Sequence, residues 1–188
     1  MYLIFMNSDL KAGFTRLLRS FDDNPDDIVQ ITRAFGLATK AHKGQHSVNK
    51  YEHYIGRSLR IALILAEELK IHDIDLVCAA LLHDAHVPND DLKEFGERVY
   101  SMLSAIDSWA QEKTSEEYFA KMRKASKDTR YIKLAERLDD IRSMKGQTFK
   151  DKVTRYKEET QKYVVPIATA TDDKLAFKLS VALYELKL

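Results

Sequence analysis

A histidine and an aspartate stand side by side at positions 83 and 84, directly after the apolar stretch Ala79–Leu82. Consecutive side chains on a helix project about 100° apart, so His83 and Asp84 can both reach one cation at a helix end. An imidazole nitrogen and a carboxylate oxygen suit Mn²⁺, Fe²⁺ or Zn²⁺. The same residue types also commonly end a helix in contact with water, and the pair recurs at His72 and Asp73. The dipeptide therefore permits a metal site without requiring one.

A second histidine, His86, follows His83 by three residues. If the helix continues that far, both imidazoles lie on one face, and His86 becomes a further candidate ligand. The alternative is a partly exposed histidine at a helix end.

The elements that must position this pair are helical. Apolar residues recur at spacings of three and four along nearly the whole chain, and no segment has the strict alternation of a strand. We expect an all-α bundle of about seven or eight helices, over residues 22–42, 54–70, 73–86, 89–106, 114–122, 128–145, 148–163 and 171–188. The third of these is apolar nearly all round, which indicates a central helix.

Capping and helix-breaking residues predict where these helices begin and end. Thr114 and Glu117 have the spacing of a capping box. The expected boundary residues are Asn24, Asn89, Thr114 and Thr148 as N-caps, and Pro88, Gly146 and Pro166 at or after C-termini.

The composition of the chain excludes several classes of protein. A length of 188 residues with 45% apolar residues suits one domain, which we place at residues 21–188. Residues 1–20 form either a helix or an extended arm of unknown role. The balance of 30 basic and 29 acidic residues favours no nucleic-acid partner. No apolar run approaches the roughly 20 residues of a membrane span, and the single Cys78 is typical of a reducing cytoplasm.

A series of segments, in order along the chain, resembles the HD-superfamily hydrolase domain of the RelA/SpoT family. They are "AHKGQ", "YIGRSLRIALILAEEL", "ALLHD" with "FGERV", "YIKLAERLDDIRSM" and "RYKEETQKYVVPIA", within residues 34–188. That family removes the 3′ pyrophosphate from (p)ppGpp with Mn²⁺, in the stringent response. The resemblance implies an all-helical HD domain in the cytoplasm, with Mn²⁺ near His83. The implied partner is a nucleotide or another phosphate-containing small molecule.

The resemblance implies a metal set of His83, Asp84 and Glu136. Glu136, in "KLAER", stands where the family has an aspartate, and glutamate can still ligate. The family's first metal histidine corresponds to Arg57, in "YIGRSL". Arginine cannot ligate a metal, because its guanidinium stays protonated and has no lone pair. His53, one helical turn earlier, is either a substitute ligand or a surface histidine. Arg57 can instead form a salt bridge with Asp84 or Glu136 and fill the metal's position with fixed positive charge.

The loop after the pair departs further from the family pattern. The family's Glu-Asp pair, implicated in positioning or activating the attacking water, corresponds to Val87 and Pro88. The run from the pair to "FGERV" is also about five residues shorter. Asp90 and Asp91 are the nearest carboxylates, and both suit the first turn of the next helix, where they favour the helix dipole. We therefore assign no catalytic carboxylate.

Cationic side chains are the candidates for neutralising a ligand's phosphates. The family's basic stretch after "GQ" is replaced here by Ser47 and Val48. The remaining candidates for nucleotide binding are Lys43, Arg57, Lys133, Arg137 and Arg142, with Asp140 at the family's asparagine position. Glu136 and Asp140 share a helix face, and the alternative for both is a solvated acidic face paired with Lys133 and Arg137.

Two functions of different class remain open. The first is a divergent metal-dependent phosphohydrolase acting on a nucleotide or phosphate ester, which the metal set and the resemblance support. The second is a catalytically inactive HD domain that binds a nucleotide or a protein partner, which Arg57 and the shortened loop support. Even a change behind a metal ligand can reduce affinity or activity roughly 10- to 100-fold. Loss of a ligand together with the catalytic carboxylates argues against authentic (p)ppGpp hydrolysis.

Overall fold

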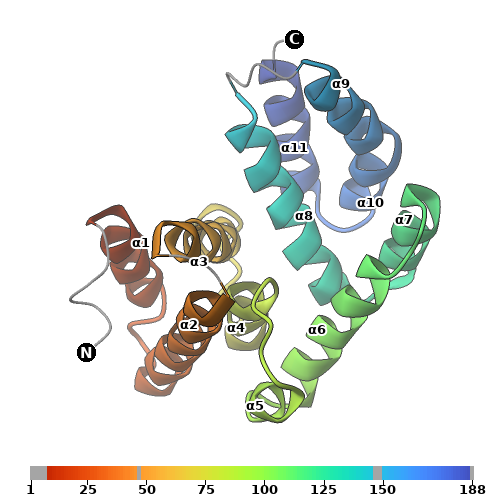
Figure 1. The fold of residues 1–188 in the computed structure, drawn as a ribbon. Coiled ribbons are helices and arrows are strands. Elements are labelled where there is room, and N and C mark those ends of the chain that lie inside the picture. The colour runs from red at the N-terminus through yellow and green to blue at the C-terminus, as the bar shows by residue number, and fades with distance from the viewer. Residues whose placement is uncertain (1–7, 46–47, 146–149, 187–188) are drawn as a thin grey trace. The chain divides into compact units, whose positions relative to one another are not determined.

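The computed structural model describes residues 8–45, 48–145 and 150–186, with side chains throughout except at residues 44–45 and 48–53. Every regular element in these ranges is a helix, and none of their residues forms a strand (Figure 1). The all-α prediction is thereby confirmed. The chain divides into two compact units, Met1–Ile106 and Asp107–Leu188, with the boundary inside helix α6 (Glu97–Ala110).

The first unit is built around α4. Its elements are α1 (Ser8–Arg19), α2 (Pro25–Gln45), α3 (Val48–Leu63), a π-helical turn (Ile64–Glu68), α4 (Ile74–Leu82), α5 (Asn89–Lys93) and most of α6. Helices α2 and α3 both pack against α4, and α1 packs on α3. Every α4 residue from Leu76 to Leu82 is buried, because an all-apolar helix has no face to offer to water. The predicted central helix is thus observed.

The N-terminal segment, left open between helix and arm, contains a helix from Ser8. The buried Phe14 of α1 stacks on Phe35 of α2, with ring centroids 4.2 Å apart. Gly13 allows α1 to approach α3, since a Cβ atom at this position would lie 3.0 Å from Leu59 Cδ2. Helix α1 therefore contributes to the core of the first unit.

The predicted end of the third helix was wrong. Helix α4 ends at Leu82 with His83 as its C-cap, several residues before Pro88. His83 and Asp84 therefore lie at the C-terminal end of the helix, where the last carbonyl groups have no partner within the helix.

The predicted helix over residues 89–106 is two helices, α5 and α6. They are separated at Gly96, whose φ of +96° is a conformation that glycine adopts without a Cβ clash. Asn89 is the first residue of α5 and makes no capping bond through its side chain, so its predicted role was also wrong. The predicted cap at Asn24 is confirmed, because its Oδ1 accepts from the N–H of Asp26 at 3.1 Å.

The second unit is organised around α8. It contains the end of α6, then α7 (Ser115–Lys124), α8 (Lys127–Ser143), α9 (Lys150–Glu159), a π-helical turn (Thr160–Val164), α10 (Val165–Thr169) and α11 (Asp173–Glu185). Helices α8 and α11 lie side by side (Figure 1). The predicted apolar stripe of α8, from Ile132 to Ile141, faces this core and is buried.

Of two helix boundaries predicted in the second unit, the one at Thr114 is confirmed and the one at Pro166 is wrong. The Thr114 capping box is confirmed, since its hydroxyl accepts from the Glu117 N–H and donates to Glu117 Oε2 at 2.9 Å. Pro166 lies inside α10 rather than after a helix. It occupies the first turn of α10, directly after the π-helical turn. Gly146 and Thr148 lie outside the described residues.

No described helix is both long enough and apolar enough to cross a bilayer.

Candidate functional site

The backbone of α4 orients the His83 ring. The His83 side chain is fully buried, and its Nδ1 lies 2.8 Å from the carbonyl oxygen of Ala80. A carbonyl group only accepts hydrogen bonds, so Nδ1 carries a proton, and in the neutral imidazole Nε2 then keeps its lone pair. A backbone carbonyl that fixes the tautomer in this way is common behind metal-ligating histidines. The ring is therefore prepared to accept at Nε2, from a metal or from a hydrogen-bond donor.

Asp84 converges on His83 and is held by Arg57. Asp84 Oδ1 lies 3.4 Å from His83 Nε2. The second oxygen, Oδ2, accepts a hydrogen bond from Nη1 of Arg57 on α3. The side chains of Arg57 and Asp84 are only 19% and 26% exposed, so water screens this ion pair less than it screens a surface pair. Of the two salt bridges predicted for Arg57, the one with Asp84 is confirmed.

In the second unit, the two predicted acidic residues on α8 have partners nearby. Glu136 Oε2 is ion-paired with Lys133, three residues earlier on the same helix, and both side chains are largely buried. Asp140 Oδ2 accepts a hydrogen bond from the Tyr156 hydroxyl at 2.7 Å. The alternative interpretation, an acidic face in salt bridges, is therefore confirmed for the Glu136–Lys133 pair. These two side chains are mostly shielded from solvent, whereas that interpretation expected a solvated face.

Arg137, a predicted phosphate contact, is engaged by its own unit. Its Nη2 donates to Glu159 Oε1 at 2.9 Å and its Nη1 to Thr160 Oγ1 at 3.2 Å. The guanidinium lies over the Tyr156 ring, 4.0 Å from the centroid, and 5.5 Å from the centroid of Phe119. Arg137 therefore joins α8 to α9 and α7, and these contacts stabilise the unit.

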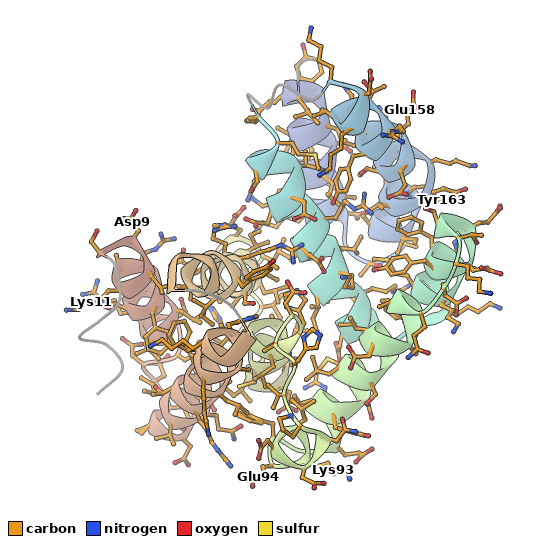
Figure 2. The ribbon with its side chains drawn as sticks, viewed as in Figure 1. Asp9, Lys11, Lys93, Glu94, Glu158 and Tyr163 are labelled. Carbon is orange, nitrogen blue, oxygen red and sulfur yellow. The ribbon has the colours of Figure 1, made fainter. Side chains whose placement is uncertain are left out.

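Aromatic rings extend this cluster toward α7. Phe119 stacks on Tyr163 with centroids 5.0 Å apart, and Figure 2 shows Tyr163 on the side of its helix that faces α7. Sequence reasoning did not find this cluster, because no local pattern links residues 119, 137, 156 and 163. Only the packing of three helices brings them together.

A small cavity lies among these side chains. It has a volume of about 50 Å³ and is lined by Tyr118, Phe119, Met122, Lys133, Glu136, Arg137, Asp140, Tyr156 and Val164. A water molecule occupies roughly 30 Å³ in the liquid, so this space suits solvent and is too small for a nucleotide. Burial raises the pKa of Tyr118 and of Tyr156. Both hydroxyls therefore stay protonated at neutral pH, and that of Tyr156 donates to Asp140.

The other predicted site residues lie apart from this chemistry. His86 is exposed and lies beyond the end of α4, so the continuing helix that would align it with His83 is absent. Lys43 is exposed near the end of α2. The side chain of His53 is outside the described part of the chain.

The loop between α4 and α5 bears out the prediction made for its acids. Asp90 and Asp91 occupy the first turn of α5 and are exposed or partly exposed. Val87, which the resemblance aligns with the glutamate implicated in positioning or activating water, is buried. An apolar side chain directed inward cannot orient or deprotonate water.

Comparisons with known proteins identify the class of this chain. The sequence profile of the HD domain family matches residues 34–172. The chain belongs to the HD domain family. No curated protein matches it.

A solved structure shares this fold over most of its chain. It is described as a metazoan ortholog of SpoT that hydrolyzes ppGpp and plays a role in starvation responses. It matches with a TM-score of 0.69 and 23% sequence identity, covering 83% of this chain and 94% of that one. The likeness shows a shared fold, and a fold by itself does not assign an activity.

Proposed function

We propose that this chain is a phosphohydrolase-like HD domain that binds a nucleotide or another phosphate ester without a resident metal. The observation that carries the proposal is the ion pair between Arg57 and Asp84. Arg57 stands where the family pattern has a metal histidine, and it adds a permanent positive charge beside the His-Asp pair. The phosphate-bearing partner and any link to the stringent response come from the family resemblance.

The paired state of the acids argues against a divalent cation. His83 offers the Nε2 lone pair of its neutral tautomer, and Asp84 Oδ1 lies 3.4 Å from that nitrogen. Asp84 Oδ2 is held by Arg57, and Glu136 Oε2 by Lys133. A metal bound to either oxygen would lie close to a guanidinium or an ammonium group, and like charges repel. We propose that these two paired cations exclude a divalent metal, and we derive no step through one.

The guanidinium of Arg57 can take over the contact with phosphate. It has five N–H donors in a planar fork that matches phosphate geometry. Asp84 accepts from Nη1 and so fixes the direction of the fork. We propose that Arg57 binds the ligand's phosphate and that Asp84 positions Arg57. Lys43, Lys133 and Asp140 stay predicted nucleotide contacts, whereas Arg137 is assigned to the structure of its own unit.

Calorimetry tests this proposal. The wild-type chain, Arg57→Ala and Arg60→Ala would be titrated with ppGpp, GDP and inorganic pyrophosphate, in EDTA and again with Mn²⁺. Arg60 is a matched control, because it is an exposed arginine one turn further along α3. A hydrogen bond to a charged group contributes about 1.5–3 kcal/mol, so Arg57→Ala should weaken binding roughly 10- to 100-fold. Arg60→Ala should bind as the wild type does. Binding that requires Mn²⁺, or that ignores Arg57→Ala, would contradict the proposal.

A second candidate is a Mn²⁺-dependent phosphohydrolase, and the tautomer of His83 favours it. In that enzyme the predicted ligands are His83, Asp84 and Glu136, with His53 and His86 as lesser candidates. A bound metal would lower the pKa of its water and polarise a phosphoryl oxygen. Pyrophosphate release from ppGpp, lost in His83→Ala, together with stoichiometric Mn²⁺ in the purified chain, would establish this candidate in place of the first.

A further inference from the structure

Helix α11 carries three large apolar side chains on its outer face. Phe177, Val181 and Tyr184 are 69%, 38% and 86% exposed. Their spacing of four and three residues aligns them along the helix. We call these three residues the α11 stripe. The opposite face of α11 is buried in the second unit through Leu175, Leu179 and Leu183. The α11 stripe is therefore a second apolar face, separate from the one that packs in the core. Clustered exposed apolar groups of this kind mark interaction surfaces.

A groove runs beside the C-terminal half of the stripe. It encloses about 560 Å³ and is lined by Lys157, Gln161, Val165, Ser180, Leu183 and Tyr184. Its walls belong to α9, the π-helical turn and the start of α10 on one side, and to α11 on the other. The volume is ample for an aromatic side chain. Phe177 projects from the N-terminal half of the same helix and does not line this groove.

We propose that the α11 stripe binds the same stripe of a second copy of this chain, with the two α11 helices antiparallel. A twofold interface is self-complementary, since each contact occurs twice. Antiparallel pairing directs Phe177 of each copy toward the groove beside Tyr184 of the other. Phe177 and the groove beside Tyr184 lie at different heights along the same helix, so each copy can supply the side chain that fills the other copy's groove.

The charges at the ends of the stripe favour this partner and this direction. Lys174 is exposed near the start of α11, and Glu185 is half-exposed at its end. Because each residue advances about 1.5 Å along a helix, placing Lys174 level with the partner's Glu185 puts Phe177 between the partner's Val181 and Tyr184. Glu185 also pairs with Lys145 of its own chain through Oε2, and a carboxylate can accept from two cations. A parallel pair would instead juxtapose like charges at both ends.

Sedimentation equilibrium of the full chain tests the surface. The wild type should show a concentration-dependent dimer, and Phe177→Asp should raise the dimer dissociation constant at least about tenfold, as loss of a central aromatic anchor does. Val29→Asp is the matched control, because Val29 is an apolar residue of α2 that is 64% exposed. It should leave the dimer unchanged. Circular dichroism verifies that each variant is folded. A wild type that stays monomeric at every concentration overturns the proposal, and so does a dimer that Phe177→Asp leaves intact.

Charge reversal tests the direction without altering the apolar contact. Lys174→Glu and Glu185→Lys should each weaken the dimer, because each places like charges level with one another at two symmetric positions. An equimolar mixture of the two variants should restore the dimer, since both pairs are then opposite in charge. A mixture no more dimeric than its components overturns the antiparallel register.

Cross-linking gives an independent measure of the same geometry. Ser180 lies close to the proposed twofold axis, so Ser180→Cys should form an intermolecular disulfide with its own copy, whereas Lys174→Cys should not. The native Cys78 is buried and does not compete. Self-cross-linking of Lys174→Cys would indicate parallel helices, in which every residue lies level with its own copy, and would overturn the proposal.

Discussion

Asp84 in the first unit and Glu136 in the second are both ion-paired acids of the HD motif set, but their cations have different origins. Asp84 is paired with Arg57 from another helix, 27 residues away in sequence. Glu136 is paired with Lys133 of its own helix, a contact open to any helix with that spacing. The pair in the first unit exists only because α3 packs on α4. In the proposed function, Arg57 is therefore the departure from the family pattern that bears on ligand binding.

Two arginines of the motif segments, Arg137 and Arg57, also differ in the contacts they make. Arg137 joins three helices of the second unit through Glu159, Thr160 and two aromatic rings. Arg57 joins α3 to the C-terminal end of α4 through Asp84, beside the imidazole of His83. We expect loss of Arg137 to damage the fold and loss of Arg57 to damage ligand binding.

The largest effect is expected for Arg137→Ala. The substitution leaves the Glu159 carboxylate without its guanidinium and removes the cation from the Tyr156 ring. Breaking a shielded ion pair in this way lowers the free energy of unfolding by about 3 kcal/mol. Urea denaturation measures the loss. Arg123→Ala, at an exposed position of α7, should change the free energy of unfolding by less than about 0.5 kcal/mol. Equal stability of the two variants would remove the structural role assigned to Arg137.

A smaller effect is expected from alkaline pH, and it acts on the second unit. Burial and a hydrogen bond to Asp172 raise the pKa of Tyr131 to about 12. The unfolded chain binds fewer protons than the folded chain above the ordinary tyrosine pKa of about 10. The stabilisation from this tyrosine is therefore complete below about pH 10 and is lost as the pH rises toward 12.

Tyr131→Phe isolates this contribution. The variant should be less stable than the wild type at pH 8, and the difference in the free energy of unfolding should shrink between pH 10 and pH 11. Urea denaturation at each pH measures it. A difference that stays constant across this range would show that Tyr131 titrates normally in the folded chain.

The smallest effect is expected for Asp84→Asn, and it sharpens the contrast between a binding site and a metal site. The amide oxygen can still accept from Arg57, so phosphate binding should change by less than about threefold, well within the contribution of one neutral hydrogen bond. In a metal site the same change removes a charged ligand and eliminates binding. Calorimetry of the wild type and Asp84→Asn with ppGpp, in EDTA and again with Mn²⁺, distinguishes the two outcomes.

The fold was largely predictable because its signals are local. Helical periodicity, the all-apolar sequence of α4 and the Thr114 capping box each depend on residues within a few positions of one another. The errors fell where the apolar period does not mark a helix boundary. The period continues across Gly96, where a positive φ separates α5 from α6, and Pro166 lies inside α10 although the sequence favoured a helix end before it.

The candidate site was predictable only in part. Adjacency in sequence was enough to bring His83 and Asp84 together, and the resemblance indicated the salt bridge of Arg57. The tautomer of His83 depends on a backbone carbonyl. The engagement of Arg137 depends on residues about twenty positions away. The spacing of the motif residues predicts neither the tautomer of His83 nor the contacts of Arg137.

Mn²⁺ binding by the wild type and by Arg57→His tests most directly whether Arg57 has replaced the metal. After incubation with excess Mn²⁺ and desalting, elemental analysis should find no stoichiometric metal in the wild type. Arg57→His removes the competing cation and adds a ligand nitrogen, so it should bind Mn²⁺ more tightly. A wild-type chain that retains about one Mn²⁺, released by His83→Ala, would contradict the replacement of the metal by Arg57.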